Sequence, residues 1–132
     1  MSARELKRYF GWDGYEEMRS DFARTDWSED RPVPRHHPGF PTEAEVLCAF
    51  NSEPDYSMSA AIYFERNGEL FELEAGHCSC YGYEECNDWD TLKPITQAYL
   101  QKRPRPYPLN ENDLEAMVCW DALVDGTLRA GK

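Results

Sequence analysis

The dipeptide Asn67-Gly68 constrains the fold of this chain more than any other short segment, because it separates two runs with the period of β-strands. Both central residues of a tight hairpin turn need a positive φ, which asparagine and glycine tolerate best. Residues 57–66 alternate, with every second side chain apolar on one face, at Met58, Ala60, Ile62 and Phe64. Residues 69–75 place Phe71 and Leu73 together on one face. Segment 57–75 is therefore predicted to be a β-hairpin.

A further strand and several helices are predicted around this hairpin. The strand covers residues 43–50, so the three strands form an antiparallel meander. The four proline residues within positions 28–41 indicate an extended connection. We predict an α+β fold in a single domain 1–132, with a small antiparallel three-stranded sheet and the N-terminal and C-terminal helices against one of its faces. Its parts in chain order are a helical segment 1–27, the proline-rich connection 28–41, the sheet 43–75, a cysteine-rich turn 76–87, and helices over about 90–101 and 111–125.

The expected helices are read from caps and apolar spacing. Ser2 and Glu5 have capping-box spacing and predict a first helix through about Tyr9, and Gly11 separates it from a second at about 13–23. The helix at 90–101 would be capped by Asp88 or Asp90, with Pro94 in its first turn. The last helix would begin after Asn110, end at Gly126 and bury four apolar side chains, Leu114, Met117, Val118 and Val124.

The segment Gly76-His77-Cys78-Ser79-Cys80-Tyr81-Gly82 is the candidate site for chemistry, and Cys86 follows it closely. His77, Cys78, Cys80 and Cys86 have the nitrogen and sulfur ligands that a zinc ion takes, and Cys48 or Cys119 could replace one of them. Cys78 or Cys80 could instead be a nucleophile assisted by His77. Redox sensing through Cys78 and Cys80, or through either of them with Cys86, is a third interpretation. A purely structural role, with small thiols packed beneath a glycine-bounded turn, is the fourth interpretation.

Charge is the other strong signal. The chain has a formal net charge of −11, and residues 41–100 contain twelve acidic residues against only Arg66 and Lys93. Such a field repels nucleic acid and attracts basic proteins. The candidate binding surface consists of the acidic residues in and after the hairpin, namely Glu65, Glu69, Glu72, Glu74, Glu84, Glu85, Asp88 and Asp90.

The five cysteines are an odd number, and the first ten residues lack the pattern of a signal peptide. No segment approaches the roughly 18 apolar residues of a membrane span. We therefore expect a cytoplasmic protein with reduced thiols, no membrane contact, and no cofactor unless zinc binds the cysteine-rich turn.

Residues 43–92 resemble small proteins encoded by phages and prophages. The resemblance rests on Glu45-Val46-Leu47, on Ala61-Ile62-Tyr63-Phe64, on the segment Asn67 to Leu73, on Gly76 to Gly82, and on a tryptophan soon afterwards, at Trp89. It carries no activity and implies an origin in a mobile element and a bacterial cytoplasm. Acidic proteins of that origin often block host machinery, including restriction and CRISPR defences.

Two functional hypotheses follow from these observations. The first is a non-catalytic acidic protein that binds a basic host protein involved in nucleic-acid handling or defence, as an anti-CRISPR or anti-restriction inhibitor does. The alternative is a zinc-stabilised module or a cysteine-dependent enzyme centred on His77, Cys78, Cys80 and Cys86. Stoichiometric zinc in protein purified without chelator would distinguish the metal-binding version.

Overall fold

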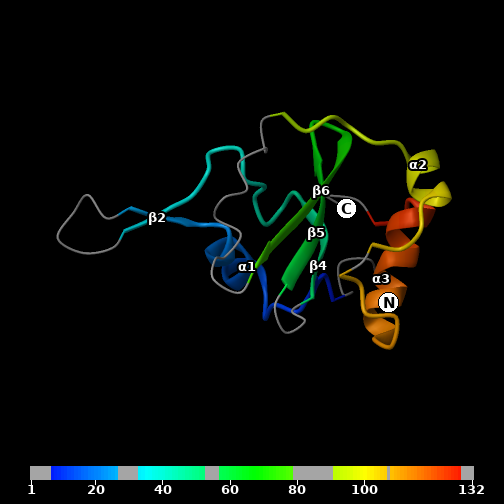
Figure 1. The fold of residues 1–132 in the computed structure, drawn as a ribbon. Helices are drawn as coiled ribbons and strands as arrows, with labels where there is room; N and C mark the ends of the chain where they lie inside the picture. Colours follow the sequence, from blue (N-terminus) through cyan, green and yellow to red (C-terminus); the bar gives the residue numbers. More distant parts are fainter. Residues whose placement is uncertain (1–6, 27–32, 53–56, 79–90, 107, 129–132) are drawn as a thin grey trace.

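The computed structural model describes residues 7–26, 33–52, 57–78, 91–106 and 108–128. Its main sheet contains β1 (Tyr9–Phe10), β4 (Val46–Ser52), β5 (Ser57–Arg66) and β6 (Glu69–Cys78), in the spatial order β1-β4-β5-β6. β4, β5 and β6 pair antiparallel, whereas β1 pairs parallel with β4 (Figure 1). The predicted meander is therefore confirmed, and one short parallel strand extends it into a mixed sheet.

The hairpin at Asn67-Gly68 is confirmed. Arg66 pairs with Glu69 across the turn, and Asn67 and Gly68 have φ of 55° and 80°. β6 continues to Cys78, three positions beyond the predicted end at residue 75, and β4 begins and ends later than the predicted strand 43–50. The cysteine-rich turn predicted at 76–87 is thus still β-strand at residues 76–78.

β1 lies where the sequence predicted the end of a helix. The backbone amide of Ala49 donates to the carbonyl oxygen of Arg8 over 2.8 Å, and the Phe10 ring stacks on Phe50 with 5.4 Å between centroids. This tertiary pairing outweighs the local helix signal at Tyr9. The Ser2–Glu5 capping box lies outside the described residues.

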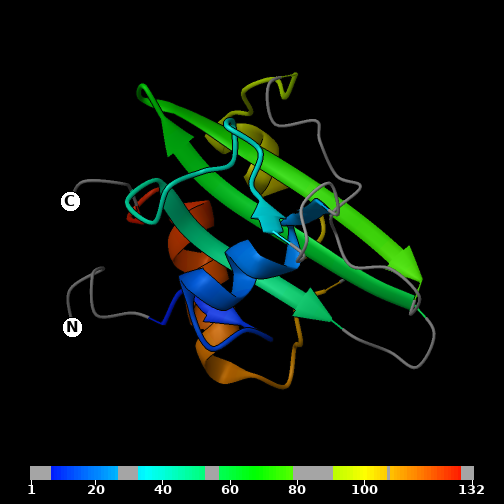
Figure 2. The same cartoon turned by 90° about the vertical axis from the view of Figure 1, so that its left-hand side faces the viewer.

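The described residues form three helices, and they cover both faces of the sheet. α1 (Tyr15–Asp21) lies on one face, whereas α2 (Gln97–Lys102) and α3 (Leu114–Asp125) lie on the other (Figures 1 and 2). The prediction of helices against a single face was wrong, because both sides of β5 are apolar. Ala60, Ile62 and Phe64 pack with the α1 side, while Ala61 and Tyr63 pack with the α3 side.

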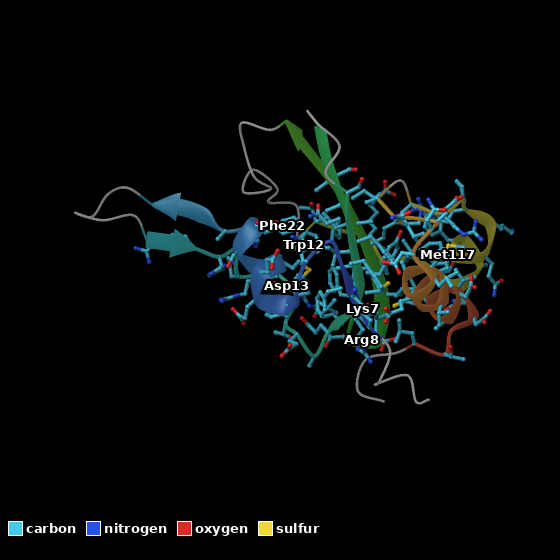
Figure 3. All side chains as sticks on the ribbon, turned by 90° about the horizontal axis from the view of Figure 1, so that it is seen from below. Lys7, Arg8, Trp12, Asp13, Phe22 and Met117 are labelled. Carbon is cyan, nitrogen blue, oxygen red and sulfur yellow. The ribbon has the colours of Figure 1, made fainter. Side chains whose placement is uncertain are left out.

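Two separate apolar clusters result, and Figure 3 shows Trp12 and Phe22 on one side of the sheet and Met117 on the other. The pairing of β4 with β5 shifts register between Val46 and Cys48, so the side chains of β4 do not simply alternate between the two clusters. Val46 and Ala49 join the α1 side, whereas the neighbouring residues Leu47 and Cys48 both join the α3 side.

α2 begins at Gln97, well after the predicted start near residue 90. Thr96 caps it, accepting a hydrogen bond from the Tyr99 amide over 3.1 Å. Pro94 precedes the helix instead of occupying its first turn. The amide of Ile95 donates to the Leu70 carbonyl over 2.7 Å, which holds this segment extended against the edge of β6.

α3 has the predicted end but a different cap and a different buried face. Asp113, and not Asn110, accepts the hydrogen bonds of the first turn, while Gly126 closes the helix with φ of 82°. The buried side chains are Ala116, Cys119, Trp120 and Leu123. Of the four side chains predicted to be buried, Met117 and Val124 are partly buried, whereas Leu114 and Val118 are exposed.

A two-stranded ribbon stands apart from the main sheet. β2 (Arg24–Asp26) and β3 (Val33–Arg35) pair antiparallel and project from the body of the molecule beyond α1 (Figure 1). β3 falls within the proline-rich connection that we predicted to be extended. Separately, none of the helices in the described ranges is long and apolar enough to cross a membrane.

The junction between β1 and α1 provides a test of the fold. Gly11 has φ of 85°, and a Cβ there would lie 2.8 Å from the Cβ of Asn51 and would collide with the Asn51 carbonyl oxygen. Gly68 has φ of 80° with open space around it. We expect Gly68→Ala to lower the free energy of unfolding by about 1 kcal/mol through backbone strain alone. Gly11→Ala should cost about 3 kcal/mol or more, because it adds the steric clash to that strain.

Urea denaturation of the two variants measures this difference. Equal destabilisation by Gly11→Ala and Gly68→Ala would contradict the close approach of Gly11 to β4.

Candidate functional site

The predicted acidic surface divides into a described and an undescribed half. Glu84, Glu85, Asp88 and Asp90 lie outside the described residues. The other four acids, Glu65, Glu69, Glu72 and Glu74, lie on the hairpin formed by β5 and β6. Their surroundings differ, so they do not form one uniform surface.

Glu72 and Glu74 both pair with Arg103, which follows the last turn of α2 and offsets one of their two negative charges. The guanidinium Nη1 of Arg103 forms an ion pair with Glu72 and donates to Glu74 over 2.9 Å. The hydroxyl groups of Tyr63 and Tyr99 each donate to the Glu72 carboxylate over 2.7 Å. The Arg103 and Glu72 side chains are only 13% and 11% exposed, so this ion pair is largely removed from water, whereas the Glu74 side chain is 51% exposed.

The pKa shifts follow from these contacts. Burial, and then the charge of Glu72, raise the pKa of Tyr63 far above its usual value. The hydrogen bond to Glu72 is the main cause of the raised pKa of Tyr99. Burial acts against the charge of Arg103, but the hydrogen bond to Glu74 and the surrounding negative charge outweigh it, so its pKa is raised. The tyrosines therefore stay protonated and donate, and the network fastens the end of α2 to β6.

Glu65 and Glu69 are placed differently, at the turn end of the hairpin. They line an open cleft of about 360 Å³ together with Gly68, Leu70, Pro94, Ile95, Thr96 and Gln97. Glu69 is exposed and Glu65 is half-buried. The cleft therefore combines two carboxylates with the apolar side chains of Leu70, Pro94 and Ile95, a lining that suits a long basic side chain.

The cysteine-rich candidate is only partly described. His77 and Cys78 belong to β6, where the register pairs them with Met58 and Ser57 of β5. Cys80 and Cys86 lie outside the described residues, so the four-ligand zinc set stays a prediction. Within the described ranges, no three histidine, cysteine, aspartate or glutamate side chains are grouped so as to hold a metal ion.

Cys48 and Cys119 were considered above as substitute zinc ligands, and the fold brings these two thiols together instead. Both are fully buried where α3 packs on β4, and both are reduced. Burial, followed by a hydrogen bond with Cys119, raises the pKa of the Cys48 thiol. A protonated thiol in an apolar core is a poor nucleophile, so these two cysteines serve packing.

The outer face of α3 is a feature that sequence reasoning missed. Leu114 and Val118 lie there in water, one helical turn apart, among exposed acidic residues. The sequence does indicate that this surface is acidic: no lysine or arginine occurs between Arg105 and Arg129. The same stretch contains five acidic residues, at Glu111, Asp113, Glu115, Asp121 and Asp125.

Comparisons of the chain with protein-family models, with curated proteins and with solved structures found no match.

The Arg103 network provides one test. Arg103→Ala would leave the Glu72 carboxylate buried without its cation, and we expect a loss of about 3 kcal/mol in the free energy of unfolding. Arg105→Ala is the matched control, because Arg105 pairs with Glu111 over 3.7 Å at an exposed position. Its loss should stay below about 1 kcal/mol. Urea denaturation measures both variants, and similar losses would show that the network does not fasten α2 to the sheet.

The buried thiols provide a second test. Cys48 and Cys119 should react with iodoacetamide at least about a hundredfold more slowly in native protein than in urea, because a core residue is exposed only when the structure opens. Mass spectrometry of the labelled peptides measures each cysteine separately. Rapid labelling of either residue in native protein would mean that the interface between α3 and β4 is open to solvent.

Proposed function

We propose that this chain is a non-catalytic binding protein that uses a negatively charged surface to hold a basic protein partner. The observation that carries the proposal is the distribution of charge. The segment 41–100 has twelve acidic and two basic residues, and Glu65 and Glu69 from it border an open cleft. A concentrated negative field increases the rate of encounter with a positively charged surface and disfavours acidic partners.

The proposed partner is a bacterial protein that handles nucleic acid. Such proteins present lysine and arginine residues to phosphate groups, and a carboxylate-rich surface competes for the same side chains. Direct binding of nucleic acid is disfavoured, because a chain of net charge −11 repels a phosphate backbone. The resemblance to phage and prophage proteins supports inhibition of a host nucleic-acid-handling or defence protein as the biological role.

A non-catalytic role is supported by how the described reactive groups are engaged. The Cys48 and Cys119 thiols are buried in the core. The Tyr63 hydroxyl and the Arg103 guanidinium are held in a closed network with Glu72. At the hairpin end, the exposed carboxylate of Glu69 lies beside the cleft, where a cation can pair with it.

The test reverses the charge at the hairpin end. Glu65→Lys/Glu69→Lys should reduce, by about tenfold or more, the amount of basic protein captured from a bacterial lysate and eluted with salt. Thermal unfolding of the double variant shows whether it is folded. The single variant Glu69→Lys, which changes only an exposed position, is measured in the same capture assay. The captured proteins are identified by mass spectrometry and tested for nucleic-acid binding.

The matched control is Glu16→Lys/Glu43→Lys, which changes net charge equally at two exposed positions near Tyr15, on the α1 side of the sheet. It should leave capture close to that of the wild type. An equal loss of capture with both double variants would mean that net charge alone explains the effect. No loss of capture with either would contradict the proposed function.

A further inference from the structure

α3 has an apolar stripe that faces the sheet, and its opposite face has two large apolar side chains that the sheet does not cover. The inward stripe packs Ala116, Cys119, Trp120 and Leu123 against the sheet. The opposite stripe repeats at helical spacing and contains Leu114, Val118, Asp121 and Asp125. Leu114 is 78% exposed and Val118 is 51% exposed, among the largest exposures of big apolar side chains in the described part of the chain.

Nothing in the packing of α3 requires these two exposed side chains. Trp120 holds the helix to the sheet, with its ring edge-on to Tyr63 and Phe50 at centroid distances of 5.5 and 6.4 Å. Asp113 caps the first turn and Gly126 ends the last one. The helix would be equally well anchored with polar residues at positions 114 and 118, which are the usual residues on a solvent-facing stripe.

The charges around the exposed pair select what could cover it. Glu111, Glu115, Asp121 and Asp125 are all exposed near Leu114 and Val118 on α3 or just before it. α3 itself contains no basic residue. A second copy of this chain docked face to face would bring like charges together, whereas a basic segment would have them compensated.

We propose that the outer face of α3 docks a basic amphipathic helix of the partner protein. Leu114 and Val118 contact the apolar stripe of that helix, and Glu115, Asp121 and Asp125 pair with lysine or arginine residues along its flanks. This inference rests on the proposed function and gives it a second contact surface.

The cleft at the hairpin end adjoins the C-terminal end of α3. Gln97, which lines the cleft beside Glu65 and Glu69, donates through its side-chain amide to the carbonyl oxygens of Leu123 and Val124 near the end of α3. The two proposed contact surfaces are therefore linked through Gln97 at the end of α3.

The experiment uses the full chain and two synthetic peptides of about 18 residues. One peptide places leucine at helical spacing with lysine and arginine on its flanks, and the other is a scrambled isomer with the same charge. Binding is measured by isothermal titration calorimetry at physiological salt. Wild-type protein should bind the amphipathic peptide about tenfold more tightly than the scrambled one, a preference that corresponds to a modest apolar contact.

Leu114→Ala/Val118→Ala should abolish that preference, and alanine keeps the helix intact because it has the highest helix propensity. Glu115→Lys/Asp121→Lys should weaken the binding of both peptides, because it removes negative charge on α3 that attracts the equal positive charge of the two peptides. Amide chemical-shift changes on adding the amphipathic peptide should concentrate on α3 and spare α1. Glu65→Lys/Glu69→Lys should leave the peptide preference unchanged, because it alters the other surface.

Three results would overturn the inference. These are equal affinity of wild-type protein for the two isomers, an unchanged preference in Leu114→Ala/Val118→Ala, and self-association of wild-type protein that this variant removes. Lysate capture separates the two proposals. If the alanine variant captures like the wild type while Glu65→Lys/Glu69→Lys does not, the α3 inference fails and the proposed function stands. If neither variant alters capture, both fail.

Discussion

The burial of β5 on both faces is the constraint on which the rest of this structure depends. Residues 60–64 are consecutive, and each of them has at most 2% of its surface exposed. An alternating strand exposes one face to water only if that face is polar, and Ala61 and Tyr63 opposite Ala60, Ile62 and Phe64 leave no polar face in this segment. The sheet therefore needs cover on both sides. α1 and the segment around Phe40 provide it on one side, and α3 provides it on the other.

The remaining open edge of the sheet, along β6, accounts for the position of α2 and the segment before it. An uncovered edge strand presents unpaired backbone groups. Ile95 pairs with Leu70 at one end of β6, and Arg103 binds the Glu72 and Glu74 carboxylates further along. Glu72 and Glu74, in the middle of β6, therefore help to hold the end of α2 against the sheet. Glu65 and Glu69 at the turn have no comparable place in this network, and they are the members of the predicted acidic surface that the described fold leaves beside a cleft.

The elements that could be predicted from the sequence are those set by local chemistry. Asn67-Gly68 demands two positive φ angles, so the hairpin and the face assignments of β5 and β6 followed directly. β1 could not be predicted in this way, because its pairing with β4 joins Phe10 to Phe50 across a long stretch of chain. The start of α2 depended on whether Pro94 would be helical, and the tertiary contact of Ile95 with Leu70 decided that it was not. For the acidic surface, sequence identified the charges but could not indicate that Arg103, distant along the chain, would pair with both Glu72 and Glu74.

The buried face of α3 shows why a correct helix prediction can still choose the wrong residues for the core. Apolar residues occur around most of this helix, so spacing alone allowed Leu114 and Val118 to be chosen as core. Trp120 decides otherwise, because its large ring fills the space beside Tyr63 and Phe50 and turns the opposite stripe towards water. That rotation leaves two apolar side chains among exposed carboxylates, on the side of α3 that faces away from the sheet. The exposed leucine and valine are not needed to pack α3 on the sheet, and this exposed apolar surface makes the outer face of α3 the place to look for a partner.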